Sequence, residues 1–214
     1  MKNYLLVIIP CLLVNPAMAQ KMIEKHMNYS QGKSIQLNIQ IADSIRIIPW
    51  EKNELYVRAV VNINDNQDND IYTWTFNDTG SNIEVSAKMP EKEFWSDKNN
   101  DCCCNRMNVF CEIHIPENAR YSVETINGNL ILAGKGPDIR AKTISGFIDM
   151  TVPGTSGADL EFKTITGTVY TNFELKSPGK RHSGMTDFDL SVNGGGRPVS
   201  LETISGNIYL RKGN

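Results

Sequence analysis

The densest group of reactive side chains is the stretch "DCCCNRMNVFCEIH", which ends at His114. Its four cysteines are Cys102, Cys103, Cys104 and Cys111. An even number of cysteines in an exported chain predicts disulfides, and adjacent cysteines do not easily bond each other, so one pattern joins Cys111 to one of the other three. The alternatives are free or mixed thiols, or a thiolate metal site with His114 as an added ligand. Three contiguous cysteines lack the two-residue gap that lets paired thiolates converge on one ion, which disfavours the metal site.

Two polar loops have the alternating spacing of calcium ligands. The oxygen-bearing residues are Asp97, Asn99 and Asp101 in one loop, and Asn64, Asn66, Asp68 and Asp70 in the other. Neither loop has the glycine at the sixth position or the glutamate at the twelfth position that complete an EF-hand. We therefore predict solvated turns, and we expect no metal or other cofactor.

No arrangement of residues predicts catalysis. His26, His114 and His182 lie in unrelated local contexts, and "NGGGRP" from Asn193 lacks the Lys and Ser/Thr that a phosphate loop needs, so we expect a wide turn there. An enzyme of the parallel β-helix type could instead carry acidic and basic groups on the outer face of consecutive coils. The candidates for such a face are Lys142, Asp149, Lys163, Tyr170 and Glu202. Any solenoid surface shows this mixture, so the chain is predicted not to be an enzyme.

Residues 1–19 have the anatomy of an export signal. Lys2 is followed by an apolar core and by "AMA" immediately before Gln20, where a signal peptidase would cut. The apolar core is shorter than the roughly 20 residues that span a bilayer, so no stable membrane insertion is expected after cleavage. The formal net charge is −2, without a large basic cluster, and nucleic acid is not an expected partner. The expected location is the periplasm, the cell surface or the medium.

Apolar and polar residues alternate along the rest of the chain. This period of two is clear in "SIQLNIQI" from Ser34, "ELYVRAVVNI" from Glu54 and "NVFCEIHI" from Asn108. Such alternation is typical of half-buried strands, and the segments between them are rich in turn-forming residues. The sequence therefore predicts an all-β protein.

A ten-residue motif occurs four times after residue 118. The copies are "VETINGNLIL" from Val123, "AKTISGFIDM" from Ala141, "FKTITGTVYT" from Phe162 and "LETISGNIYL" from Leu201. Their glycines are 18, 21 and 39 residues apart, and "HSGMTDFDL" from His182 is a worn copy, with Gly184, in the longest interval. A period of about 20 residues is typical of stacked coils.

The motif predicts a corner in each coil. Leu201 and Thr203 share one parity, whereas Ile204, Ile208 and Leu210 share the other, and both sets suit a core. The backbone should therefore bend between Thr203 and Ile204 so that both sets point inward. The motif glycines, expected to permit a positive φ or the close approach of a neighbouring coil, are Gly128, Gly146, Gly167 and Gly206.

These features predict a repetitive, single-domain β-solenoid or β-helix-like stack of short strands. A meander of hairpins or a β-sandwich is the alternative. Residues 20–118 would form an irregular N-terminal β portion, and residues 119–214 would form the repeat portion of the same domain.

The motifs resemble a bacterial family provisionally named as adhesins, which carries a DUF4097/DUF2807-like, or toastrack, domain. The resemblance rests on "TINGNLIL", "TISGFIDM", "TITGTVYT" and "TISGNIYL", on "EIHIPENARYSVET", and on "SIRIIPWEKNELYVRA". It covers most of the chain after the signal. It implies an exported or envelope-tethered β-solenoid, and it supplies no catalytic residues.

The expected function is a non-catalytic adhesin or cell-envelope binding module. The partner would be an envelope polymer, a glycan or an envelope protein. The outward aromatic candidates, of which at least half are expected to be buried, are Trp74, Phe94, Trp95, Tyr170 and Tyr209. The alternatives are an accessory protein of envelope-stress signalling and, less favoured, a carbohydrate-active β-helix enzyme.

Overall fold

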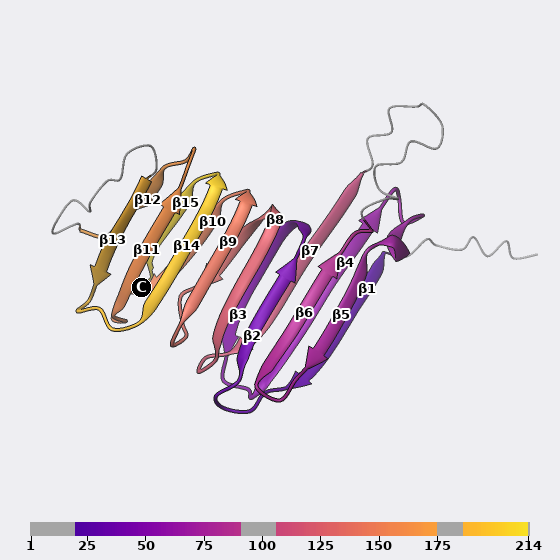
Figure 1. Cartoon of the computed structure of the whole chain (residues 1–214), viewed down its shortest axis with the longest axis horizontal. Coiled ribbons are helices and arrows are strands. Elements are labelled where there is room, and N and C mark those ends of the chain that lie inside the picture. Colours follow the sequence, from indigo (N-terminus) through magenta and orange to yellow (C-terminus); the bar gives the residue numbers. More distant parts are fainter. Residues whose placement is uncertain (1–19, 91–105, 175–185, 214) are drawn as a thin grey trace, which may run out of the picture.

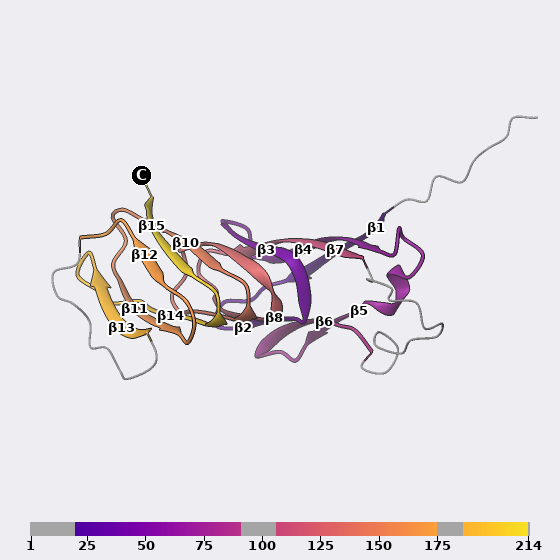
Figure 2. The same cartoon turned by 90° about the horizontal axis from the view of Figure 1, so that it is seen from above.

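The computed structural model describes residues 20–90, 106–174 and 186–213. Its strands lie side by side along the long axis of the molecule (Figure 1), in two facing layers (Figure 2). We call the layer that begins with β1 the upper sheet and the layer that begins with β5 the lower sheet. Strand β8 runs through both layers, so the fifteen strands of the described residues belong to one hydrogen-bonded network, which these residues do not close into a barrel. The all-β prediction is confirmed.

Each layer has a fixed strand order. The upper sheet contains, in spatial order, β1 (Lys21–Asn28), β4 (Glu54–Ile63), β7 (Met107–Pro116), β3 (Ile41–Trp50), the second half of β8 (Arg120–Ala133), β10 (Ile148–Pro153), β15 (Ile208–Gly213) and β12 (Val169–Thr171). The lower sheet contains β5 (Thr73–Asp78), β6 (Asn82–Lys88), β2 (Ser34–Ile39), the first half of β8, β9 (Ile139–Ser145), β14 (Pro198–Ser205), β11 (Ala158–Thr164) and β13 (Thr186–Val192). A 3-10 turn, Asn69–Ile71, precedes β5.

Five coils form the regular part of the molecule. In each coil a lower strand passes through a corner into an upper strand, and neighbouring coils pair in parallel. In spatial order the coils are β2–β3, β8, β9–β10, β14–β15 and β11–β12. The apolar side chains that alternate along these strands fill the space between the layers, as the period of two predicts.

The motif glycines form a column at the corners. A Cβ on Gly146 would overlap the carbonyl oxygen of Gly128, one on Gly206 would overlap that of Gly146, and one on Gly167 would overlap that of Gly206. Gly128 approaches Ala42 of the first coil in the same way. Close approach of neighbouring coils, the second of the two expected roles of these glycines, is therefore common to all four.

A buried threonine ties each corner to the next coil. Thr143 Oγ1 donates to the Gly128 carbonyl at 3.1 Å, and Thr203 Oγ1 donates to the Gly146 carbonyl at 3.2 Å. Thr164 Oγ1 donates to the Gly206 carbonyl at 3.2 Å. These hydroxyls satisfy carbonyls at the turning point of the backbone, where a buried unpaired acceptor would cost about 1–3 kcal/mol.

The prediction that the backbone bends between Thr203 and Ile204, so that both side chains point inward, is wrong. Thr203 is buried, but Ile204 is 37% exposed, and the isoleucines at the same position of the other motifs are exposed too. The turn lies around Gly206, and the inward set resumes at Ile208. The isoleucine of the motif therefore lies on the outer surface of the lower sheet, not in the core.

The coils are not stacked in the order of the sequence. The C-terminal coil β14–β15 lies between β9–β10 and β11–β12, and it pairs in parallel with both. In the sequence, β11–β12 follows β9–β10, but in space the two coils are separated by the C-terminal coil β14–β15, and β11–β12 is the terminal coil of the stack. A simple solenoid would have added each coil to the end of the stack.

The worn copy of the motif does not form a sixth coil. His182 and Gly184 lie outside the described residues, but the rest of that stretch enters β13, which pairs antiparallel with β11. A coil strand would pair in parallel. Strand β13 therefore ends the lower sheet as an edge strand.

Arg197 joins the loops at the edge opposite the corners. Its guanidinium donates to the carbonyl oxygens of Gly136 at 2.8 Å, Gly134 at 3.2 Å and Gly157 at 2.8 Å. These glycines belong to the loops that leave β8 and β10. Arg197 follows the Asn193–Gly196 segment, which is a turn, as expected from the sequence.

Candidate binding face

Four aromatic rings gather on the outer face of the upper sheet, where β1, β4, β7 and β3 lie side by side. They belong to His26, Tyr56, His114 and Trp50. The Tyr56 ring centroid is 4.6 Å from that of His26 and 5.7 Å from that of His114, and the Trp50 centroid is 4.9 Å from that of His114. The register explains the group, because His26 pairs with Tyr56 and Tyr56 pairs with His114. We call these four residues the histidine–tyrosine cluster.

Hydrogen bonds fix the rings of this cluster. The Trp50 indole donates to the carbonyl of Glu54 at 2.7 Å, and His26 Nδ1 lies 2.7 Å from Glu54 Oε1. His114 Nε2 lies 2.9 Å from Glu112 Oε1. Side chains held in this way lose little further conformational freedom when a ligand binds.

Charged groups border the same cluster. Lys52 Nζ lies 4.7 Å from the centroid of the Trp50 ring. The Tyr56 hydroxyl donates to Glu24 Oε1 at 3.2 Å. Partial loss of hydration and, second, this hydrogen bond raise the pKa of Tyr56, so its hydroxyl stays protonated and remains a donor at neutral pH.

The prediction that the histidines lie in unrelated contexts is wrong for two of them. His26 and His114 flank Tyr56, although they are far apart in the sequence. His114 does lie on the polar face of its strand, as its alternation with Glu112 predicts. No local signal could have revealed the cluster, because it depends on how β1 and β7 are placed against β4. His182 lies outside the described residues.

A second aromatic group lies at the other end of the same face. The rings of Tyr170 on β12 and Tyr209 on β15 stack at 5.3 Å with an interplanar angle of 12°, and Phe147 meets Tyr209 edge-on. Arg211 makes two 2.8 Å hydrogen bonds to the carboxylate of Asp149 beside them. Tyr170 is 51% exposed. We call Tyr170 and Tyr209 the tyrosine pair.

A continuous row of side chains connects the two ends. The paired positions across the upper sheet are Glu24, Arg58, Glu112, Arg46, Ile131, Asp149, Tyr209 and Tyr170. Four strand spacings separate His114 on β7 from Tyr209 on β15, which is roughly 19 Å. The upper sheet thus presents an aromatic group at each end and polar groups between them.

The five residues that could have formed a β-helix enzyme site are divided between the two sheets, although Lys142, Glu202 and Lys163 occupy neighbouring positions on the lower one. Lys142 and Glu202 pair at 2.8 Å on the lower sheet, and Lys163, also on the lower sheet, pairs with Glu161 at 2.6 Å. Asp149 and Tyr170 lie on the upper sheet. The three charged candidates on the lower sheet are therefore all in ion pairs. The outer faces of the two sheets point in opposite directions, so the five candidates cannot act on one substrate.

Cys111 lies in the core rather than near an open site. It is 3% exposed on β7, and burial raises the pKa of its thiol to about 12. His114, three residues later, points from the opposite face of the strand, so the two side chains cannot ligate one ion. Cys102, Cys103 and Cys104 lie outside the described residues, so the disulfide remains a prediction.

We expect Cys111 to resist alkylation while the protein is folded. The pKa of Cys111 is higher in the folded protein than in the unfolded one. The contribution of the neutral thiol to the free energy of unfolding is therefore fully present below about pH 9, and it is lost as the pH rises toward about 12. Iodoacetamide at pH 8, followed by mass spectrometry, should leave Cys111 unmodified until denaturant is added. Modification at the same rate in both conditions would contradict its burial, and failure to react after unfolding without reductant would indicate a disulfide.

The remaining candidates have structural roles. In the loop after β4, Asn64 donates to Asp68 at 2.6 Å, Asn69 donates to Asn66 at 3.1 Å, and Asp70 pairs with Lys21 at 2.6 Å. Among the described residues, no group of three His, Cys, Asp or Glu side chains is placed to hold a metal ion.

The five aromatic candidates divide unevenly. Tyr170 is exposed, and Tyr209 is half-buried on the outer face. Trp74 is half-buried and packs against the core from β5. Phe94 and Trp95 lie outside the described residues, as do the acidic loop with Asp97, Asn99 and Asp101 and the expected signal, residues 1–19.

Comparison with known proteins supports the fold. No family model matches the chain, and no curated protein matches it. A provisionally named cell adhesion protein from Clostridium sporogenes has a similar crystal structure, with a TM-score of 0.54 and 11% identity over 91% of this chain and 100% of that chain. A provisionally named adhesin from Bacteroides fragilis aligns over 91% of this chain and 98% of its own, with 10% identity and a TM-score of 0.24, which is too low to carry an argument. The first likeness shows a shared fold. Within the described ranges, no helix has the length and apolarity to cross a membrane.

Proposed function

We propose that the protein is an exported, non-catalytic adhesin-like module that binds an extended glycan or related envelope polymer across the outer face of its upper sheet. The observation that carries this proposal is the placement of the histidine–tyrosine cluster and the tyrosine pair at two ends of one face. The proposal also draws on the resemblance of the motifs to the toastrack family and on the shared fold with a protein named for cell adhesion.

The chemistry of the face suits a carbohydrate. Flat aromatic rings bind the C–H faces of sugars, while the carboxylates and guanidinium groups between the rings can hydrogen-bond their hydroxyls. The spacing of roughly 19 Å between His114 and Tyr209 favours a polymer over a single sugar. The face carries paired charges of both signs, including Glu24 with Arg58 and Asp149 with Arg211, so a strongly charged polymer is not required.

Binding and cleavage are tested together with a panel of envelope and host polysaccharides. The purified protein should be retained by one or more of the polymers without producing new chain ends. The appearance of new chain ends would show an enzyme and overturn the proposal. The absence of both retention and cleavage would overturn the proposal as well. That result would favour a protein partner, as for an accessory protein of stress signalling.

Single-ring variants locate the binding face. Tyr56→Ala and Tyr170→Ala should each weaken binding of a soluble fragment of the retained polymer about tenfold, because each removes a stacking surface at one end. Calorimetric titration measures the dissociation constants. Ile165→Ala is the matched control, since Ile165, directly after β11 of the lower sheet, is 48% exposed and its loss should leave the affinity unchanged. Equal losses for all three variants would place the binding site elsewhere.

A further inference from the structure

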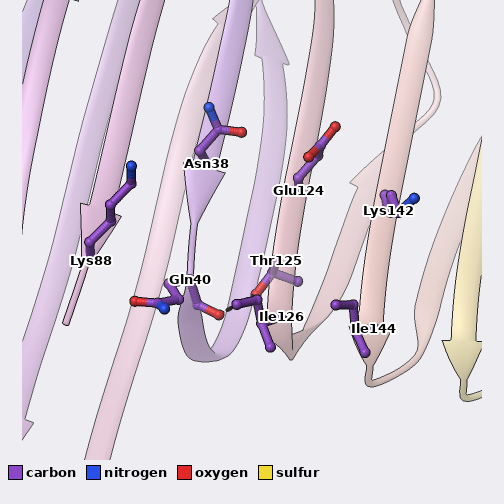
Figure 3. Close-up of a pocket in the computed structure, with 8 residues that line it drawn as sticks. All are labelled: Asn38, Gln40, Lys88, Glu124, Thr125, Ile126, Lys142 and Ile144. Carbon is purple, nitrogen blue, oxygen red and sulfur yellow. Dashed lines mark hydrogen bonds between the residues drawn. The ribbon is translucent and has the colours of Figure 1, made fainter. Parts of the chain in front are cut away.

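The outer face of the lower sheet carries an exposed apolar row. Ile126, Ile144 and Ile204 lie on β8, β9 and β14, and Ile165, at the same motif position, follows directly after β11; this is also their spatial order. They are 47%, 40%, 37% and 48% exposed. Figure 3 shows the first two side by side, below Glu124 and Lys142 on the same strands, where they border a groove of about 340 Å³. An apolar row that crosses four neighbouring coils beside their corners is unusual for a surface that faces only water.

A charged row runs beside the isoleucines, two residues away along each strand. In the same spatial order it consists of Glu124, Lys142, Glu202 and Lys163, so the signs alternate. Within the molecule, Lys142 pairs with Glu202 at 2.8 Å, and this carboxylate raises the pKa of Lys142. Both rows lie on the outer face, because the intervening threonines point into the core.

The two rows are complementary to themselves under a twofold rotation. An axis parallel to the strands, between β9 and β14, places Glu124 of one copy opposite Lys163 of the other and Lys142 opposite Glu202. The same rotation places Ile126 opposite Ile165 and Ile144 opposite Ile204. A twofold axis perpendicular to the strands would place like charges opposite each other within the row, so the charges select one orientation.

Farther from the corner, one more pair of positions is complementary in charge. Arg120 and Asp159 lie at the equivalent position on the outermost two of these strands, and the axis places them opposite each other. Arg140 of β9 faces Ser200 of β14, which carries no charge. Cross-strand pairing within one molecule is sufficient to explain the alternation of the charged row. It does not explain the opposite charges of Arg120 and Asp159, because Asp159 pairs with the uncharged Pro198.

From this symmetry we propose that the protein forms a face-to-face dimer through the isoleucine rows of its lower sheets. The partner is a second copy of this chain, related by the twofold axis between β9 and β14. Each isoleucine would be removed from water and bordered by interchain ion pairs, in the arrangement of an apolar centre with a polar rim. The inference does not rest on the proposed function. The dimer would leave both upper sheets facing outward, and two copies of any binding face would point in opposite directions.

Charge reversal and rescue provide the sharpest test. Glu124 and Lys163 are three strand spacings apart in one molecule, roughly 14 Å, beyond the range at which exposed charges interact strongly. In the dimer they are opposite each other. Glu124→Lys and Lys163→Glu alone should each weaken dimerisation about tenfold or more, and the double variant should restore it. Sedimentation velocity of the purified protein from micromolar to submillimolar concentrations measures the dimer dissociation constant.

Apolar variants test the same surface independently. Ile144→Glu with Ile204→Glu brings carboxylates together at the axis and should give a monomer, while Phe110→Glu, at a residue 51% exposed on the upper sheet, should remain dimeric. Circular dichroism checks that each variant is folded. A wild-type monomer at every concentration would overturn the proposal. A dimer that survives the isoleucine changes, or a double charge variant that is no stronger than the singles, would overturn it as well.

Discussion

Replacing Gly206 with alanine should destabilise the protein by about 3 kcal/mol or more, as expected for overpacking in a site that cannot relax. A Cβ at this position would overlap the carbonyl oxygen of Gly146, and the obstructing atom belongs to the backbone of the neighbouring coil rather than to a flexible side chain. The carbonyl also accepts the Thr203 hydroxyl, so moving it away would break that hydrogen bond. Urea denaturation followed by circular dichroism measures the change in the free energy of unfolding.

Gly194→Ala is the control for this prediction. Gly194 has a φ of 89° in the turn after β13, and a Cβ there would meet no atom within 4 Å. Its substitution should cost about 1 kcal/mol, the strain of a left-handed residue alone. If both substitutions cost the same, the glycine column would matter only through backbone conformation, and the close packing of the corners would be refuted.

The repeat could be predicted from the sequence because its chemistry is local. Each copy of the motif carries its own corner, with a glycine where the next coil approaches and a threonine that bonds to it. The position of Ile204 could not be predicted in the same way. Isoleucine suits a core and a protein interface equally well, and only the place of the bend, at Gly206, decides which face it occupies.

The candidate binding face could not be predicted, because it depends on long-range register. His26, Tyr56 and His114 belong to three strands that are distant in the sequence, and nothing near any of them indicates the other two. Tyr170 and Tyr209 were predictable as outward residues from their strand parity, but their stacking follows from the insertion of β15 beside β12. A period in the sequence indicates that coils stack, and does not indicate in which order.

The inserted C-terminal coil should be essential for the whole stack. Removing residues 198–214 deletes β14 and β15, the strands that connect β9–β10 to β11–β12 in both sheets. It also removes four core side chains, those of Val199, Leu201, Ile208 and Leu210. At about 2 kcal/mol for each buried side chain, this loss is comparable with the whole stability of a typical domain, about 5–15 kcal/mol.

The truncated protein should therefore lose cooperative unfolding, and hydrogen exchange should show that the amides of β11 and β13 are unprotected. Removing residues 20–28 is the matched control, because β1, among the strands that the structure describes, pairs only with β4 and contributes no fully buried side chain. That deletion should lower the melting temperature but preserve the transition and the protection of β11. Cooperative unfolding together with protection of β11 after loss of the C-terminal coil would mean that the terminal coil does not depend on β14 and β15, and the inserted order of the coils would then be wrong.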